Sequence, residues 1–362
     1  MTITHLSNYL TVNFGVSFID SFYKFVFCKV FIIDMKKQFF LGLKLFVIFL
    51  LSGLCAYAQN SKEYVSNTFR ISAKKQVIAI YPNSNNKKRL IDIEENITES
   101  KVKNNNGIAF LISVSDYQNP SIPKMKFAKK DASLMKEYLI KRLGYDPKNI
   151  YPKSFEEIPT AGYLKTFLKD YLKRILRPDG KSELFIYYVG HGAPSLNNGN
   201  SAYLVPYDAN PNYLTDINAY AINEFFADIN VLNAAKKTIV IDACFSGQSG
   251  DGTSLIANAS PLTIKPKVDI FSDEKSAIFM SSRGDQVSNW YPEMQHGLFT
   301  YFFLKGLKGI ADLNTDGKIT LQEMETYLND PNEGIPYISN KDFQRPQEAQ
   351  IIGNKQAIMV VN

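Results

Sequence analysis

Two short apolar runs in the middle of the chain each lead to a chemically reactive side chain. The first, ELFIYYVG at 183–190, is followed directly by His191. The second, TIVI at 238–241, is followed after two residues by Cys244. Runs of β-branched and aromatic residues of this length are typical of strands that are buried on both faces. Because ligands bind at the carboxyl edge of an open parallel sheet, the sequence predicts a functional site where these two strands end.

From Gly107 onward the pattern alternates between strands and helices. Strands are predicted at 108–114, 150–151, 183–190, 238–241, 276–281 and 357–361, with a small hairpin at 202–206. Helices with apolar residues at intervals of three and four are predicted at 131–143, 161–176, 217–234 and 298–310. This alternation implies right-handed crossovers and an α/β fold, with a mostly parallel central sheet and helices on both faces.

Composition and charge set limits on the partners. The chain has 362 residues, of which 45% are hydrophobic, and its net charge is +6. Its Lys and Arg side chains are spread along the sequence, and the one short basic block is Lys87-Lys88-Arg89. Nucleic-acid binding needs clustered positive charge, so no nucleic-acid partner is expected.

The amino-terminal region has the pattern of an export signal. Basic residues at 35–37, an apolar run at 39–54 and Ala56-Tyr57-Ala58 predict a signal peptide at 35–58. The protein is therefore expected to be exported, to the periplasm or outside the cell, and to meet a membrane only through this signal. Residues 1–34 are interpreted as an upstream start-site extension, with a membrane segment within 14–47 as the alternative. The polar stretch 59–106 is interpreted as a pro-segment or linker.

Removal of the signal peptide leaves Cys244 as the single cysteine. Such a thiol is either a small buried hydrophobic group or a reactive one. If the two strands are neighbours, Cys244 and His191 meet at the same sheet edge, which favours nucleophilic catalysis in which the imidazole takes the thiol proton. The backbone N–H groups of Gly192 and Cys244 are the candidate oxyanion donors. No side chain is assigned as a third catalytic residue.

Five motifs in order identify a family resemblance: ISVSDY at 112–117, YYVGHG at 187–192, YLVPYDA at 203–209, VIDACFSG at 240–247 and HGLFTYFFLKGL at 296–307. From about Gly107 the chain resembles the caspase-like cysteine peptidases, and among them the bacterial members related to metacaspases and paracaspases. The resemblance implies one caspase-like three-layer sandwich domain at 107–362. It also implies an endopeptidase that needs no cofactor for its chemistry, with His191 as the catalytic histidine and Cys244 as the nucleophile.

The residue two positions before the cysteine departs from animal caspases, which carry Gln there. Asp242 matches a pocket residue of metacaspases and paracaspases, and Asp131 matches a second acidic residue of that pocket. Two partly desolvated carboxylates favour a cation between them. The resemblance therefore implies cleavage of proteins or peptides after Arg or Lys. The alternatives are that Asp131 is a helix N-cap and that Asp242 is a structural acid satisfied by backbone amides. Asp285, in the loop 281–286, is a further candidate at the pocket border.

A second motif, at 312–323, has the spacing of an EF-hand loop. The turn position is Gly317, and the oxygen ligands of a Ca²⁺ site are expected at the alternating positions that this loop uses. An alternative is a helix–loop–helix connector that keeps the turn without useful affinity. The candidate ligands are Asp312, Asn314, Asp316, Lys318 through its carbonyl, Thr320 and Glu323.

Two other functions remain open from the sequence. One is a non-catalytic interaction module on the same fold, and the other is a transpeptidase or ligase that uses the same acyl-enzyme. Zymogen control is a further expectation. Self-cleavage is expected in the polar loop 248–272, near Lys265, Lys267 and Lys275, or at the basic block 87–89.

Overall fold

The computed structural model describes residues 92–195, 202–210, 213–255 and 274–361. Internal contacts divide the chain into two units, residues 1–87 and 88–362, and every described residue belongs to the second unit. The predicted signal peptide at 35–58, the extension 1–34 and most of the stretch 59–106 lie outside the described residues. Among the helices of the described residues, none is long and apolar enough to cross a membrane.

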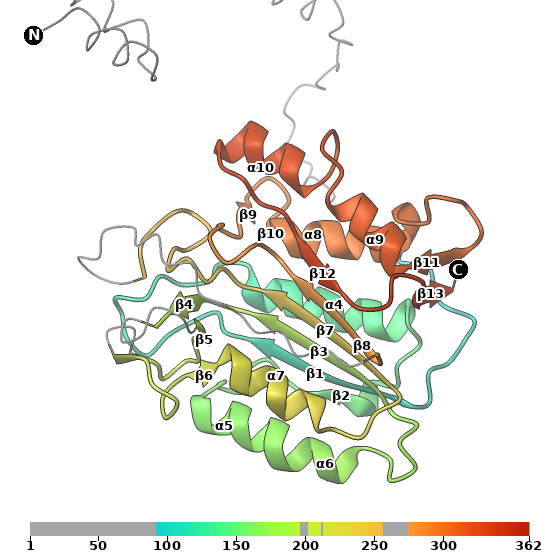
Figure 1. Cartoon of the computed structure of the whole chain (residues 1–362), viewed down its shortest axis with the longest axis horizontal. Helices are drawn as coiled ribbons and strands as arrows, with labels where there is room; N and C mark the ends of the chain where they lie inside the picture. Colours follow the sequence, from blue (N-terminus) through green and yellow to red (C-terminus); the bar gives the residue numbers. More distant parts are fainter. Residues whose placement is uncertain (1–91, 196–201, 211–212, 256–273, 362) are drawn as a thin grey trace, which may run out of the picture. The chain divides into compact units, whose positions relative to one another are not determined.

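The centre of the domain is a six-stranded sheet with the order β12-β8-β7-β3-β1-β2 (Figure 1). Five of its strands are parallel, and the edge strand β12 is antiparallel to β8. This arrangement confirms the predicted mostly parallel sheet. The strands are β1 (Gly107–Ser113), β2 (Ile150–Tyr151), β3 (Glu183–Val189), β7 (Lys236–Asp242), β8 (Ser276–Met280) and β12 (Gln350–Ile352).

Helices cover both faces of this sheet, which gives three layers (Figure 1). On one face, α4 (Ala128–Lys141) and α8 (Leu298–Lys305) bury apolar side chains against the strands. On the other face lie α5 (Ala161–Thr166), α6 (Leu172–Ile175) and α7 (Ile222–Asn230), over a second apolar core. The π-helical segment η2 (Phe167–Tyr171) joins α5 to α6, so the predicted helix 161–176 is continuous. A second π-helical segment, η4 (Gly306–Ile310), extends α8 to the predicted end.

Three predicted elements differ from those in the structure. The helix predicted from residue 131 begins at Ala128, with Phe127 as its N-cap. The helix predicted at 217–234 is shortened to α7, because β6 (Tyr220–Ala221) pairs with β5 (Ala202–Leu204). The segment predicted as a hairpin is the middle strand of a small antiparallel sheet, whose third strand is β4 (Gly192–Pro194). In each case the pairing or packing of a distant segment outweighs the local pattern.

The carboxyl-terminal part adds smaller elements around this core. The predicted last strand, β13 (Ile358–Val361), pairs with β11 (Lys318–Thr320) and lies outside the central sheet. Helix α9 (Leu321–Leu328) follows β11 directly, and helix α10 (Ile335–Phe343) precedes the strand β12. The remaining elements are η1 (Pro147–Asn149), β9 (Trp290–Tyr291) and β10 (His296–Gly297).

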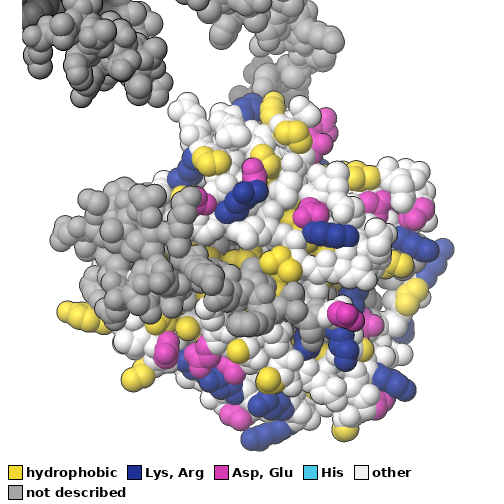
Figure 2. Space-filling view, in the orientation of Figure 1, with side chains coloured by type: hydrophobic (Ala, Val, Ile, Leu, Met, Phe, Trp, Pro, Cys, Tyr) yellow, Lys and Arg dark blue, Asp and Glu magenta, His cyan; other side chains and the backbone are white. Residues whose placement is uncertain are grey.

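The charged side chains are mixed on the surface. On the face shown in Figure 2, Lys and Arg lie among acidic and neutral side chains, and the described residues there form no continuous basic patch. Several Lys side chains are paired with a carboxylate, as in Lys165 with Glu224 at 2.9 Å. A mixed surface of this kind is typical of a solvated face.

Candidate active site

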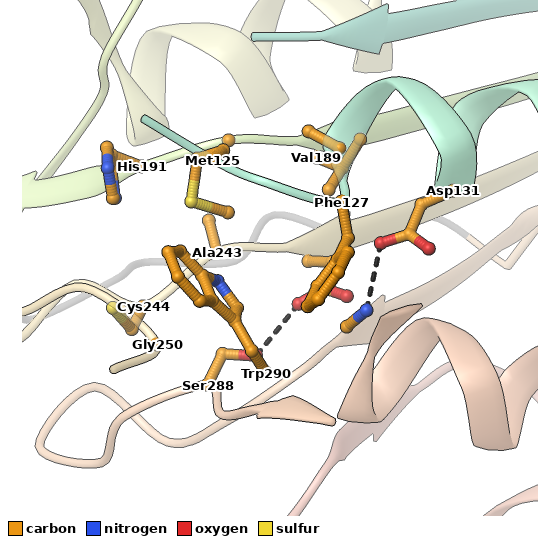
Figure 3. A pocket seen from close by; sticks show the side chains of 14 residues that line it. Met125, Phe127, Asp131, Val189, His191, Ala243, Cys244, Gly250, Ser288 and Trp290 are labelled. Carbon is orange, nitrogen blue, oxygen red and sulfur yellow. Dashed lines mark hydrogen bonds between the residues drawn. The ribbon is translucent and has the colours of Figure 1, made fainter. Parts of the chain in front are cut away.

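Strand register places the two candidate catalytic residues at one edge of the sheet. In the parallel pair β3 and β7, Val189 is the partner of Asp242. His191 and Cys244 each follow two residues later, and both line the same pocket. Figure 3 shows them at one end of this pocket, with Asp131 at the opposite end. The structure therefore brings together the imidazole and the thiol that the sequence predicted.

The imidazole of His191 is buried and oriented by two neighbours. Its Nε2 lies 2.7 Å from the carbonyl oxygen of Pro123, and since a carbonyl only accepts, Nε2 carries the proton. In this tautomer Nδ1 is the basic nitrogen. The ring of Tyr117 stacks on the imidazole with centroids 5.1 Å apart, and the Tyr117 hydroxyl accepts the His191 backbone N–H at 2.9 Å. Burial lowers the pKa of His191 to about 4, so the ring is neutral at pH 7.

This orienting carbonyl is a functional group that sequence reasoning missed. Every residue has a backbone carbonyl, so the identity of Pro123 contained no signal for this role. Tyr117 lies inside the motif ISVSDY, which marks the family resemblance but did not reveal that its side chain contacts His191.

Cys244 lies in a closed environment. Its side chain is nine-tenths or more buried, at 4% exposure for the residue, and its Sγ donates to the carbonyl of Gln248. Burial raises the pKa of Cys244 above its ordinary value, although the positive charge of Arg345 acts in the opposite direction. Arg345 also donates to the carbonyl of Gly250 at 2.6 Å and so holds the loop that follows the cysteine. The thiol is therefore neutral and covered in this conformation.

Gly192 has a packing role that the sequence did not predict. A Cβ atom at this position would lie 2.6 Å from both the carbonyl oxygen of Cys244 and the ring of Phe245. The absence of a side chain at Gly192 thus allows Cys244 and Phe245, at the end of the neighbouring strand, to pack closely against it. Gly192 is not among the residues that line the pocket, whereas Gly190 is.

Asp131 and Asp242 face each other at the acidic end of the pocket. A Cβ atom at Gly297 would lie 2.6 Å from Oδ2 of Asp242 and 3.3 Å from Oδ2 of Asp131. Burial raises the pKa of both carboxyls, to about 6 for Asp131. The structure thus places the two predicted pocket acids together.

The hydrogen bonds of these acids contradict the N-cap interpretation of Asp131, and they show that Asp242 is satisfied within the protein by donors that are mainly hydroxyl groups. Asp131 lies in the first turn of α4 but is not its N-cap. Its Oδ1 contacts Nδ1 of His296 at 2.5 Å, and its Oδ2 accepts the N–H of Gly297 at 3.0 Å. Asp242 is satisfied mainly by hydroxyl groups, from Ser288 at 2.8 Å and Thr300 at 2.7 Å, with the Thr300 N–H at 3.3 Å. His296 is a second residue that sequence reasoning missed, although it begins the motif HGLFTY.

Asp285 does not lie at the pocket. It is exposed on its loop and is not among the residues that line the pocket. From the segment that follows, Ser288 and Trp290 line it instead. The prediction was wrong because Asp285 lies in the exposed part of the loop, and the chain reaches the pocket only at Ser288, three residues later.

In the loop 312–323, Gly317 has a φ of +80°, as the predicted turn at this position requires. Asp312 accepts the N–H groups of Asp316 at 3.1 Å and Gly317 at 3.0 Å, and Glu323 forms a capping box with Thr320. Within the described residues, no three or more His, Cys, Asp or Glu side chains gather as metal ligands. The loop carboxylates accept backbone N–H groups of the loop itself, and calcium binding stays a prediction.

The layers, the sheet order and the strand-end pocket define a three-layer α/β sandwich with a histidine–cysteine site. A sequence model of the caspase domain matches residues 106–350, which is more than half of the chain. The chain therefore belongs to the caspase domain family.

Solved structures that resemble this chain were also found. Caspase-1 from Spodoptera frugiperda is 14% identical, with a TM-score of 0.44, and the match covers 77% of this chain and 95% of that chain. A protein from Geobacter sulfurreducens is 15% identical, with a TM-score of 0.45, over 71% of this chain and 100% of that chain. Among curated proteins, none matches this chain.

Proposed function

We propose that this protein is a cysteine endopeptidase that cleaves peptide bonds after Arg or Lys. The observation that supports this proposal most strongly is the shared pocket of His191 and Cys244, with two buried carboxylates at its other end. A nucleophile, a neutral imidazole with a free Nδ1 and an acidic recognition site are the parts that such a reaction needs.

The proposed reaction follows from the protonation states. Nδ1 of His191 takes the thiol proton, and Sγ of Cys244 attacks the peptide carbonyl carbon. The N–H groups of Gly192 and Cys244 are the proposed donors to the tetrahedral oxyanion. The imidazolium then protonates the leaving amine as the C–N bond breaks, and water hydrolyses the acyl-enzyme.

The described conformation is proposed to be the resting state. The thiol donates to the carbonyl of Gln248, and the loop bearing Gly250 is held by Arg345. Attack on a substrate therefore requires this loop to move away from Cys244. Cleavage within the loop 248–272, whose residues 256–272 lie outside the described residues, is a proposed trigger.

Specificity is proposed to come from Asp131 and Asp242. Each carboxylate retains acceptor capacity beyond its contacts within the protein, because an ionised carboxyl group accepts up to about four hydrogen bonds. A guanidinium or ammonium group between them removes the repulsion of two buried like charges. An acidic side chain would add a third negative charge and is therefore rejected.

The test is hydrolysis of fluorogenic peptides that end in Arg, Lys or Asp, with calcium and with a chelator. The expected result is release after Arg or Lys, no release after Asp, and no release with Cys244→Ala. Equal release by Cys244→Ala would contradict the proposal, and absence of any release would favour the non-catalytic module. A transpeptidase would instead yield a new amide product when an amine is added.

Export through residues 35–58 is also proposed, on the sequence pattern alone. Amino-terminal sequencing of the protein recovered from the periplasm or medium is expected to begin at Gln59. A mature protein that retains residues 35–58 would contradict this proposal.

A further inference from the structure

A chain of ionisable groups, buried at its pocket end and partly exposed at the other, extends from the substrate pocket to a segment far upstream. The imidazole of His296 is fully buried, and its Nδ1 lies 2.5 Å from Oδ1 of Asp131. Its Nε2 lies 3.0 Å from Oε1 of Glu94, which Lys130 contacts at 2.5 Å. Both ring nitrogens face carboxylate oxygens, so the two contacts fix the orientation of the ring between Asp131 and Glu94.

Glu94 is held in place by its own segment. Ile93 and Ile97 are buried in the core beneath α4 and α8. The hydroxyl of Tyr138 donates to the carbonyl of Ile93 at 2.8 Å, and Lys308 donates to the carbonyl of Glu95 at 2.8 Å. The segment 92–97 is therefore docked on the domain, although it lies upstream of the family match at 106–350.

Glu94 is ionised in this arrangement. Partial burial opposes its ionisation, but the hydrogen bonds from Lys130 and His296 outweigh that effect, and the pKa of Glu94 lies below its ordinary value. The groups that face one another are thus three carboxylates (Glu94, Asp131 and Asp242), the Lys130 ammonium and the His296 imidazole. Of these, Asp131 and Asp242 line the pocket.

We infer that Glu94 is a positioning residue for the substrate pocket: it holds His296 against Asp131 and thereby sets the preference of the pocket for a cationic side chain. This inference rests on the proposed function. Without the Glu94 charge, the His296 ring loses its carboxylate partner at Nε2, which is one of the two contacts that orient it. Asp131 then loses its fixed donor, and the pocket carries less negative charge for an incoming Arg.

The experiment measures peptide binding in the full chain carrying Cys244→Ala, so that no cleavage is needed. Fluorescence anisotropy compares a labelled peptide ending in Arg with the same peptide ending in citrulline, its neutral isostere. In this background Glu94→Gln is expected to weaken binding of the Arg peptide about tenfold, because a charge-assisted hydrogen bond is lost. Binding of the citrulline peptide is expected to change less than twofold. Glu95→Gln is the matched control, and Glu94→Asp is expected to retain part of the affinity.

In the chain with Cys244 intact, Glu94→Gln is expected to raise KM for the Arg substrate and to leave kcat within twofold. A merely structural role would lower kcat as well. Thermal unfolding of each variant checks folding, and Glu94→Asp provides the comparison if Glu94→Gln does not fold.

Three outcomes are distinct. Weaker Arg binding with Glu94→Gln but not with Glu95→Gln supports the inference. Equal affinities of Glu94→Gln and Glu95→Gln for the Arg peptide overturn the inference. If the Cys244→Ala background still binds the Arg peptide more tightly than the citrulline peptide, the proposed function stands. If that background binds Arg and citrulline peptides equally, both the specificity and the inference fail.

Discussion

Val189 and Asp242 are register partners in the parallel strand pair β3 and β7, and His191 and Cys244 each lie two residues beyond them. The position of the imidazole relative to the thiol is therefore set by backbone hydrogen bonds between buried strands. It does not depend on a contact between the two side chains. Replacing one of them is expected to leave the other in place, which makes single substitutions interpretable.

Tyr117→Phe tests the orientation of His191. The change removes the hydroxyl that accepts the His191 N–H but keeps the stacked ring. A buried N–H without a partner costs about 1–3 kcal/mol, so kcat is expected to fall about tenfold while KM changes less than twofold. Steady-state kinetics with an Arg peptide measure this effect. Tyr213→Phe, at a side chain that is 72% exposed, is the control. Unchanged kcat in Tyr117→Phe would show that the ring alone orients His191.

Gly192→Ala tests the close approach of the two strand ends. The added methyl group would lie 2.6 Å from the carbonyl oxygen of Cys244, so we expect a loss of about 1–3 kcal/mol in the free energy of unfolding. Gly162→Ala is the matched control, because nothing lies within 4 Å of its Cβ position in α5. This control is expected to gain about 0.5–1 kcal/mol from helix propensity. Denaturant unfolding compares them, and equal stability of the two variants would refute the packing argument.

The thiol of Cys244 is expected to react slowly in the folded protein. Burial raises its pKa above the ordinary value of 9.0, and the reactive species is the thiolate. Alkylation by iodoacetamide, located by peptide mass spectrometry, is expected to be at least about tenfold slower than in the urea-unfolded chain at pH 7. The rate is expected to keep rising as the pH passes 9. A plateau below pH 8 would mean that the thiolate is already formed.

Asp131 is expected to make stability fall with rising pH. Its pKa of about 6 in the folded state lies above the ordinary 3.8, so the folded state binds the proton more tightly than the unfolded state does. The free energy of unfolding therefore decreases between about pH 4 and pH 6, by about 2 to 3 kcal/mol. His191, with its pKa lowered to about 4, contributes the opposite slope in this window.

Asp131→Asn isolates the contribution of Asp131. Urea unfolding of this variant and of the wild type is compared at pH 4.5 and pH 7. The free energy of unfolding of the variant minus that of the wild type is expected to be larger at pH 7 than at pH 4.5. The same difference at both pH values would contradict the assigned ionisation of Asp131.

Calcium binding at the loop 312–323 is expected to be weak. The loop pairs with β13 through β11, and an ion would share the carboxylate oxygens of the loop with the backbone N–H groups that they already accept. Isothermal titration is expected to give a Kd of about 10⁻⁴ to 10⁻³ M, in the range of low-affinity calcium loops. Asp312→Asn and Glu323→Gln are expected to abolish binding, and Glu333→Gln, outside the loop, to leave it unchanged. No binding by the wild type would support the connector interpretation.

The fold and the site edge were predictable from sequence for a physical reason. Buried parallel strands require near-continuous apolar runs, and helices require apolar residues at intervals of three and four. These local rules located the strands that end before His191 and Cys244, and the helices on both faces. They failed where a distant segment decides, as at the start of α4 and at the short α7.

Only the tertiary structure decided how the site is held. The carbonyl of Pro123 lies 68 residues from His191 in sequence, and His296 lies 165 residues from Asp131 and 202 from Glu94. A backbone carbonyl is common to all residues, and contacts over such separations depend on how whole layers pack. The sequence itself thus determined which residue types carry the proposed chemistry. The tautomers, counterions and burial of these residues arise from packing, because desolvation and hydrogen bonding depend on what surrounds each group.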